Sequence, residues 1–136
     1  MNGKIWGGMI VLLFFISCND SDLPNVNGMW QLKTIEDENH VISPIDTIFY
    51  SFQRQAIFAY TILQEKENAA ATAEVLYGYV DFPSDKKMII QLDNRYHVIQ
   101  SKTFWNDTIV TYDILRLDAK KMVLSEDNKI YSFIKH

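Results

Sequence analysis

The sequence predicts an all-β domain, an antiparallel meander of about eight strands closing into a barrel. From residue 28 to residue 136, short runs rich in β-branched and aromatic residues recur, each bounded by polar turn residues. The chain offers no long helical crossover of the kind that parallel strands require. Eight up-and-down strands close naturally into a small barrel, with a two-sheet sandwich as the competing outcome.

The first predicted strand covers residues 29–35 (MWQLKTI) and ends at a polar stretch. Residues 47–64 carry apolar side chains in alternation but are too long for one typical strand. We therefore expect two strands hinged near Arg54. Residues 65–73 (EKENAAATA) have no apolar stripe, which predicts a long hairpin loop or a single helical turn.

The second half of the chain continues the same pattern. Residues 83–85 form a predicted turn after a strand at 76–82. At most one short helix is expected, in the less regular segment 94–106, where it would plug one end of the barrel. The remaining strands are expected at residues 88–92, 108–117, 122–125 and 129–135.

The start of the chain indicates export. Lys4 precedes the uncharged apolar stretch Ile5–Ile16, whose 12 residues are too few for the ~20 of a membrane-spanning helix. They fit the apolar region of a secretory signal. The stretch ends in Phe15-Ile16-Ser17-Cys18, which resembles the bacterial lipoprotein signal. The alternatives are a free structural cysteine or an ordinary secretory signal cut nearby.

The resemblance implies a signal peptide at residues 1–17 and a lipidated Cys18 that binds the mature protein to a membrane. Residues 18–27 are polar and aperiodic, which predicts a flexible tether before a domain at 28–136. The acidic residues after Cys18 resemble export tags of Bacteroidota lipoproteins. They imply an outer-membrane protein of a Gram-negative bacterium exposed at the cell surface; a periplasm-facing protein is the alternative.

Charge and cysteine content exclude other classes. Loss of residues 1–17 removes only Lys4, so the formal charge moves from −4 to −5. An acidic domain with dispersed lysines gives no electrostatic case for nucleic-acid binding. A single cysteine cannot form an intramolecular disulfide, which would otherwise be common in an exported domain.

The stretch Asn27-Gly28-Met29-Trp30 resembles the G-x-W opening of lipocalin-like domains, and a last strand at 129–135 suits that fold. With the lipoprotein start, the chain resembles small lipocalin-like lipoproteins of uncharacterised function from Bacteroidota. The resemblance implies a lipocalin-like barrel in which Trp30 packs across the closed end. An arginine usually covers this tryptophan, and Arg116 on a late strand is the candidate.

Residues with catalytic chemistry are sparse, so we expect no enzyme, metal or cofactor. The histidines, at positions 40, 97 and 136, have no partner at metal-ligand spacing. No G-x-S-x-G elbow or glycine-rich phosphate loop occurs. Asp81 and Asp113 lie inside strand-like runs, where we expect them to point outward because buried acids are rare unless paired.

Aromatic residues are abundant and suggest two readings. They either line a pocket for a small hydrophobic ligand or fill the barrel as a solid core. The favoured function is ligand binding without catalysis, and the alternative is a solid-cored interaction module that docks another cell-envelope protein. The candidate ligand-binding residues are Trp30, Tyr50, Phe58, Tyr60, Tyr79 and Tyr112.

Two identical Asp-Thr-Ile triplets, at residues 46–48 and 107–109, open two predicted strands. Asp-Thr-aliphatic resembles the O-glycosylation signal of exported Bacteroidota proteins, which makes Thr47 and Thr108 candidate acceptors. The alternative is that Asp and Thr simply begin strands after turns.

Overall fold

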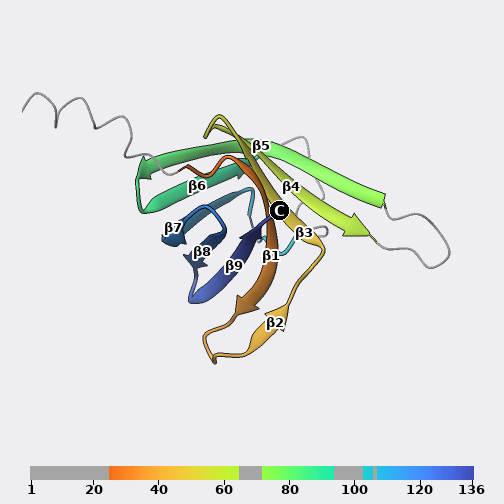
Figure 1. The fold of residues 1–136 in the computed structure, drawn as a ribbon, viewed down its shortest axis with the longest axis vertical. Helices are drawn as coiled ribbons and strands as arrows, with labels where there is room; N and C mark the ends of the chain where they lie inside the picture. Colours follow the sequence, from red (N-terminus) through yellow and green to blue (C-terminus); the bar gives the residue numbers. More distant parts are fainter. Residues whose placement is uncertain (1–24, 65–71, 94–102, 106) are drawn as a thin grey trace, which may run out of the picture.

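A computed structural model describes residues 25–64, 72–93, 103–105 and 107–136 of the 136-residue chain. Its nine strands form one antiparallel sheet (Figure 1). The described residues contain no helix, and hence none that could cross a membrane. The strands are β1 (Gly28–Glu36), β2 (Ile42–Pro44), β3 (Ile48–Gln53), β4 (Ile57–Gln64), β5 (Thr72–Ser84), β6 (Lys87–Leu92), β7 (Ile109–Leu117), β8 (Lys121–Glu126) and β9 (Lys129–Lys135).

The sheet closes on itself because β1 pairs with β3 on one side and with β9 on the other. Trp30 is opposite Tyr50 in the first pairing and opposite Lys135 in the second. The remaining strands pair in chain order, so β1 and β3–β9 make an eight-stranded barrel. The predicted all-β meander is thus confirmed, and the sandwich alternative is wrong.

The short strand β2 was not predicted. It pairs only with the last residues of β1, where Thr34 is opposite Pro44, and lies outside the closed ring of strands. All three of its residues are exposed, so no alternation of apolar and polar side chains signals it. The strand at 76–82 is also longer than expected, because β5 extends to Thr72–Ser84 through its pairing with β4.

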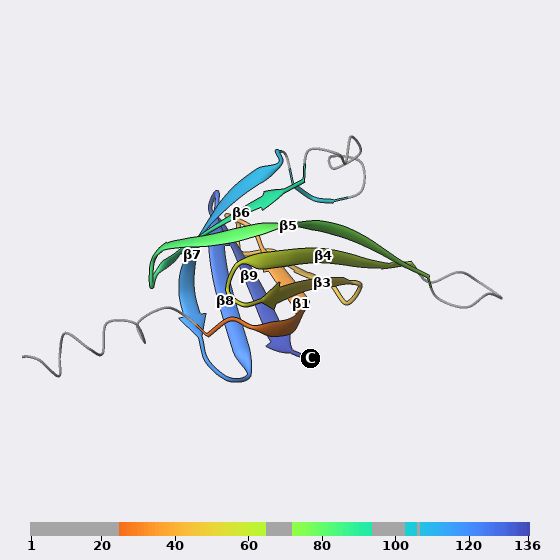
Figure 2. The same cartoon turned by 90° about the horizontal axis from the view of Figure 1, so that it is seen from above.

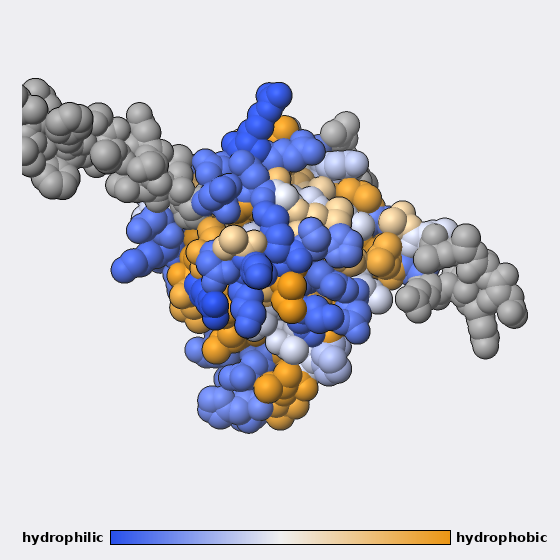
Figure 3. Space-filling view, in the orientation of Figure 1, coloured by the Kyte–Doolittle hydropathy of each residue, from blue (hydrophilic) through white to orange (hydrophobic). Residues whose placement is uncertain are grey.

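Alternating side chains fill the barrel. On β4, for example, Phe58 and Tyr60 point inward and are fully buried, while their neighbours are more exposed. Every fully buried side chain among the described residues is apolar or aromatic. Figure 3 shows the opposite pattern outside, with hydrophilic residues over most of this face and apolar residues in scattered groups.

The hinge predicted near Arg54 is a tight turn between β3 and β4. Arg54 and Gln55 both adopt left-handed backbone conformations, with φ of 55° and 53°. The amide of Gln55 donates to the Asn27 side chain at 2.8 Å, which joins this turn to the residue before β1. The β8–β9 turn uses the same region of φ, at 52° for Asp127 and 62° for Asn128.

The strand turns define two ends of the barrel (Figure 2). We call one the tether end: the described chain begins there, and it carries the β3–β4, β5–β6 and β7–β8 turns and the C-terminal His136. We call the other the mouth. It carries the β1–β2 and β8–β9 turns, residues 103–105 and Asp107, which comes just before β7.

Candidate functional site

Aromatic rings occupy the centre of the barrel and surround Tyr50 on β3. The Tyr50 ring centroid lies 5.0 Å from that of Phe58, 5.3 Å from that of Tyr60 and 4.8 Å from that of Phe133. The rings of Trp105 and Tyr112 approach it from the mouth at 6.3 and 6.2 Å. These are the edge and tilted arrangements that aromatic pairs favour. Together they leave this level of the barrel filled.

The Tyr50 hydroxyl anchors a hydrogen-bond network inside this cluster. It shares a hydrogen bond of 2.7 Å with the Tyr112 hydroxyl and accepts one of 2.9 Å from the Trp105 indole N–H. All three side chains are buried, so each polar atom needs the others as partners. The network fixes Trp105, which precedes β7, against the strands on the far side of the barrel.

The Tyr60 hydroxyl differs, because it makes no well-formed hydrogen bond with a described residue, although it lies near the Phe104 backbone. Burial raises its pKa well above the ordinary value, and the Phe104 backbone offsets this only in part. Burial likewise raises the pKa of Tyr50 and of Tyr112. These phenols therefore stay neutral at physiological pH and act as hydrogen-bonding groups, not as bases.

Trp30 closes the tether end. Its indole N–H donates to the Val26 carbonyl at 2.8 Å, and both side chains are fully buried. The Lys135 ammonium lies 4.6 Å from the centroid of the indole ring, in cation–π geometry, and also donates to the Asn27 carbonyl. Gly28 makes room for this lysine, because a Cβ there would lie 2.6 Å from Lys135 Cε.

The mouth holds a small cavity of about 140 Å³. It is lined by Val110 and Tyr112 of β7, by Tyr131 of β9, and by Phe104 and Trp105, which precede β7. The rings of Phe104 and Tyr131 stack at 5.6 Å with 18° between their planes. The rim is charged and carries Asp107, Glu126, Asp127 and Lys129.

The structure brings five of the six predicted ligand-binding residues together. Tyr112 lines the mouth cavity, while Trp30, Tyr50, Phe58 and Tyr60 lie deeper and are fully buried. The sixth, Tyr79, is 66% exposed on the outer face of β5. Asp81 and Asp113 also point outward, as expected, and Asp113 Oδ1 lies 3.8 Å from Lys87 Nζ.

The two predicted glycosylation sites have matching backbone positions. Thr47 and Thr108 each precede a strand, and their carbonyls accept the amides of Leu63 and Leu92 at 2.8 Å. Thr47 is exposed. Thr108 is half-buried, and its hydroxyl lies 3.4 Å from Asp107 Oδ1.

Other predictions concern residues outside those that the structure describes. They include the lipid attachment at Cys18, His97 and most of the loop or helical turn predicted at 65–73, whose last two residues instead belong to β5. The predicted helix falls largely on the same undescribed part, residues 94–102 and 106. In the described part of the chain, no group of three or more His, Cys, Asp or Glu side chains could hold a metal ion.

Comparison with known proteins decides the family. The sequence profile of the lipocalin-like domain matches residues 12–136. The chain belongs to this family. Its lipocalin-like barrel agrees with the G-x-W resemblance, since Trp30 lies at the closed end as expected. No curated protein matches the chain.

Two solved structures share the lipocalin-like fold. A lipocalin-like protein from Bacteroides uniformis is 18% identical in sequence, with a TM-score of 0.70 over 82% of this chain and 98% of that one. An uncharacterized protein from Bacteroides eggerthii is 25% identical, with a TM-score of 0.68 over 81% of this chain and 98% of that one.

Several site residues escaped the sequence analysis. Phe104, Trp105 and Tyr131 were not singled out as ligand-binding residues, although they line the cavity. The expectation that Arg116 covers Trp30 is wrong, because Lys135 covers that ring and Arg116 Nε donates to Asp118 at 2.8 Å. The pairing of Trp30 with Lys135 across β1 and β9 depends on barrel closure, so no local pattern signals it.

Proposed function

We propose that this protein is a lipid-anchored lipoprotein whose lipocalin-like barrel binds a small, ring-bearing hydrophobic molecule at its mouth. The observation that carries the proposal is the cavity of about 140 Å³ at the mouth, whose lining includes Tyr112, Tyr131 and Trp105. Aromatic faces offer stacking, and tyrosine hydroxyls orient a bound ring by hydrogen bonds. The family assignment supports the same role.

The cavity limits the size of the ligand. An apolar cavity of about 150 Å³ holds one benzene ring, whereas sites for larger molecules run to about 300–1,000 Å³. The pocket therefore accepts one ring, and the rest of the ligand lies on the rim. Three of the four charged rim residues are acidic, which favours a neutral or cationic ligand over an anion.

The chemistry of the buried tyrosines supports binding without catalysis. Its central ionisable groups are the tyrosines Tyr50, Tyr60 and Tyr112, whose raised pKa values keep them protonated. A general base must be able to lose its proton near the working pH. We therefore assign these phenols to packing and hydrogen bonding.

The anchor belongs to the same proposal. Lipidated Cys18 would bind the protein to the outer membrane, with the barrel at the cell surface or, alternatively, facing the periplasm. We expect Cys18→Ala to release the protein from membranes and to leave its signal peptide uncleaved. Membrane association like that of the unchanged protein, with a mass that differs from it only by the substitution itself, would contradict the anchor and leave the barrel's ligand site untouched.

Ligand binding is tested by filling the cavity. Val110 lines it and is 9% exposed, so Val110→Phe places a ring where the ligand's ring would lie. Leu115→Phe is the matched control, because Leu115 is 57% exposed on the far part of β7. With p-cresol as the probe, we expect saturable quenching of Trp105 fluorescence that V110F abolishes and L115F retains.

A second function rests on a different observation. Outside the barrel, Ile57 and Tyr79 face each other across β4 and β5, and Tyr77 lies beside them; all three are exposed. This supports the alternative of a solid-cored module that docks another envelope protein. If p-cresol does not quench the fluorescence of the unchanged protein, that result would favour the docking module over the ligand site.

Glycosylation remains a proposal for Thr47 and Thr108. Exposure favours Thr47 as the acceptor, because the Thr108 hydroxyl is half-buried beside Asp107. Intact mass measurement of the protein from its own organism is the test. We expect added sugar mass that Thr47→Val removes; an unmodified mass would contradict it.

A further inference from the structure

The barrel separates its charges between its two ends, which the sequence does not suggest. Of the nine Lys and Arg residues that the structure describes, seven lie at the tether end, on the three turns there or on the adjoining strand ends. These seven are Arg54, Lys86, Lys87, Arg116, Lys120, Lys121 and Lys135. Three acids, Asp85, Asp113 and Asp118, lie among them.

The mouth carries the opposite charge. Of the thirteen described acids, nine lie at or near it, against the two remaining basic residues, Lys33 and Lys129. The nine are Glu36, Asp37, Glu38, Asp46, Glu74, Asp93, Asp107, Glu126 and Asp127. The described part of the barrel therefore has a strong charge asymmetry along its length, although the net charge of the chain is modest.

The basic groups at the tether end are available for a partner. Arg54, Lys86, Lys120 and Lys121 are exposed and form no ion pair with any residue that the structure describes. The ion pairs of Lys87 with Asp113 and of Arg116 with Asp118 are themselves more than two-fifths exposed at every side chain. Such exposed pairs hold weakly and exchange readily with another anion.

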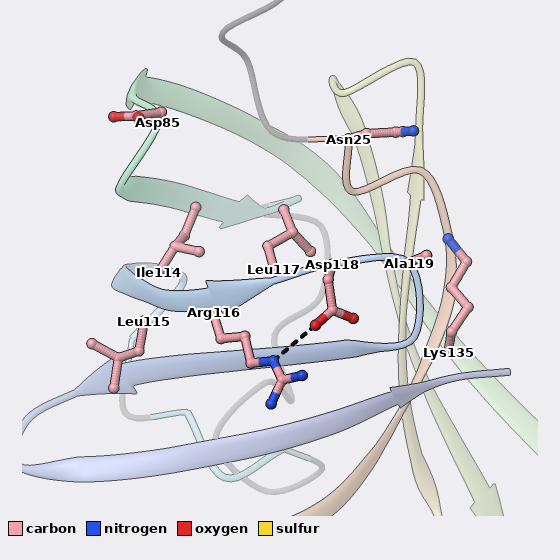
Figure 4. Close-up of a pocket in the computed structure, with 9 residues that line it drawn as sticks. All are labelled: Asn25, Asp85, Ile114, Leu115, Arg116, Leu117, Asp118, Ala119 and Lys135. Atoms are coloured by element: carbon pink, nitrogen blue, oxygen red, sulfur yellow. Dashed lines mark hydrogen bonds and ion pairs between the residues drawn. The ribbon is translucent and has the colours of Figure 1, made fainter.

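A hollow lies at the tether end, and two of the seven basic residues, Arg116 and Lys135, line it. It has a volume of about 550 Å³ and is lined by Asn25, Asp85, the β7–β8 turn and Lys135. In Figure 4, Asn25 and Lys135 lie on one side of the hollow, and the Arg116–Asp118 pair lies below it. The hollow is thus an open recess between basic turns, at the point where the described chain begins.

The length of the chain before Asn25 keeps this end near the anchor. Cys18 and Asn25 are seven residues apart, so even a fully extended segment spans only about 25 Å. We propose that the tether end docks on the anionic phosphate groups of the membrane lipids, so that the mouth points away from the membrane. This inference rests on the lipid anchor in the proposed function.

Electrostatics gives the docking its direction. Each Lys or Arg near an anionic surface strengthens membrane attraction about fivefold, within a Debye length of about 8 Å. The acidic mouth is repelled by the same surface. The anchor holds the domain at the membrane, and the two opposing charges then select one orientation, which leaves the ligand cavity open to the surroundings.

The test measures orientation in the full, acylated protein. Cys18 is the single cysteine, and in the proposed lipoprotein a diacylglyceryl thioether blocks its sulfur, so one introduced cysteine can be labelled selectively. Ala119→Cys reports the tether end and Asn128→Cys reports the mouth; both positions are exposed. Energy transfer to acceptor lipids is measured in phosphatidylcholine vesicles with and without phosphatidylglycerol.

On vesicles with phosphatidylglycerol, we expect severalfold stronger transfer from position 119 than from position 128. The difference should fall towards unity at about 1 M salt, where the Debye length is about 3 Å. The variant K120E/K121E should lose the difference. The control K33E/K129E makes the same change in net charge at the other end and should keep it.

Equal transfer from both positions on anionic vesicles would overturn the orientation, as would an equal loss in the control variant. An acidic protein partner for the tether end, in place of lipid, would also give equal transfer in these protein-free vesicles. Failure of the anchor is separable, because an unacylated protein leaves vesicles at high salt, whereas an acylated but unoriented one stays bound.

Discussion

Two buried tyrosines on neighbouring strands provide a matched test of the central network. The Tyr50 hydroxyl has two partners, whereas the Tyr60 hydroxyl makes no well-formed hydrogen bond with a described residue. Tyr50→Phe leaves the Tyr112 hydroxyl and the Trp105 N–H without their shared partner, at a cost of about 1–3 kcal/mol. We expect urea unfolding to report this loss for Y50F.

Tyr60→Phe is the control for that measurement. It removes a buried hydroxyl, and no other group loses a hydrogen-bond partner as a result. We therefore expect the free energy of unfolding of Y60F to lie within about 0.5 kcal/mol of that of the unchanged protein. Equal losses in the two variants would contradict the network.

Gly28 is the second residue whose environment makes a sharp prediction. Its φ of 119° disfavours any other L-residue, and a Cβ would also meet the Lys135 side chain. We expect the backbone strain of Gly28→Ala to lower the free energy of unfolding by about 1–3 kcal/mol. The clash with Lys135 should lower it further. Adding Lys135→Ala should relieve the clash and leave the strain; a fully stable G28A would refute this account.

At the residue scale, alternation along β5 predicts which side chains face outward. The alternation that places Asp81 outside also places Tyr77 and Tyr79 outside, since all three share one face of β5. Tyr79 was nevertheless chosen for the interior because it is aromatic. Trp105 and Phe104 lie before β7 in a segment without periodicity, so only the folded barrel reveals their contacts.

At the scale of elements, the β8–β9 turn shows how local sequence determines the type of a two-residue hairpin turn. Glu126 pairs with Lys129 across it, and both intervening residues have positive φ, as a type I′ turn requires. Asn tolerates this conformation, and β-branched residues do not. We expect Asn128→Val to destabilise the protein by about 1–2 kcal/mol and Asn128→Gly to be neutral or mildly stabilising.

Thermal unfolding of the two variants measures that difference. Similar midpoints for N128V and N128G would mean that the turn does not adopt this conformation in solution.

Most strands could be predicted, for a physical reason. Those with one face in the core show the alternation of β4 and β6, and polar turns separate them. The exposed strand β2 shows no alternation, and the length of β5 depends on its partner β4. Barrel closure between β1 and β9 was inferred from strand number, and their register is a property of the folded sheet alone.

At the scale of the whole molecule, the tyrosine core predicts alkaline sensitivity. Burial raises the pKa of Tyr50, Tyr60, Tyr112 and Tyr131 above the ordinary value near 10. Above about pH 10 the unfolded chain releases phenolic protons that the folded chain retains, so unfolding becomes more favourable. Below that pH the contribution is fully present.

We therefore expect a constant urea midpoint between about pH 7 and 9, and a fall as the pH rises through 10 to 12. Tyr112→Phe should reduce the steepness of that fall. A midpoint that stays level up to about pH 12 would contradict the burial of these phenols.

The charge asymmetry between the two ends of the barrel is a feature of the whole molecule that could not be predicted from the sequence. Lys86, Lys120 and Lys121 are scattered along the chain and were read as dispersed charge. The meander returns the chain to the same end at every second turn, which gathers them beside Asn25. Net charge and composition carry no information about such clustering, because it arises from topology.

The proposed function is tested most directly by native mass spectrometry of the protein extracted with mild detergent from its own membrane. We expect the diacylglycerol and acyl mass on the peptide beginning at Cys18, together with a co-purifying small ring-bearing molecule that is absent from V110F and retained by L115F. A barrel that consistently carries no small molecule in the unchanged protein would contradict ligand binding.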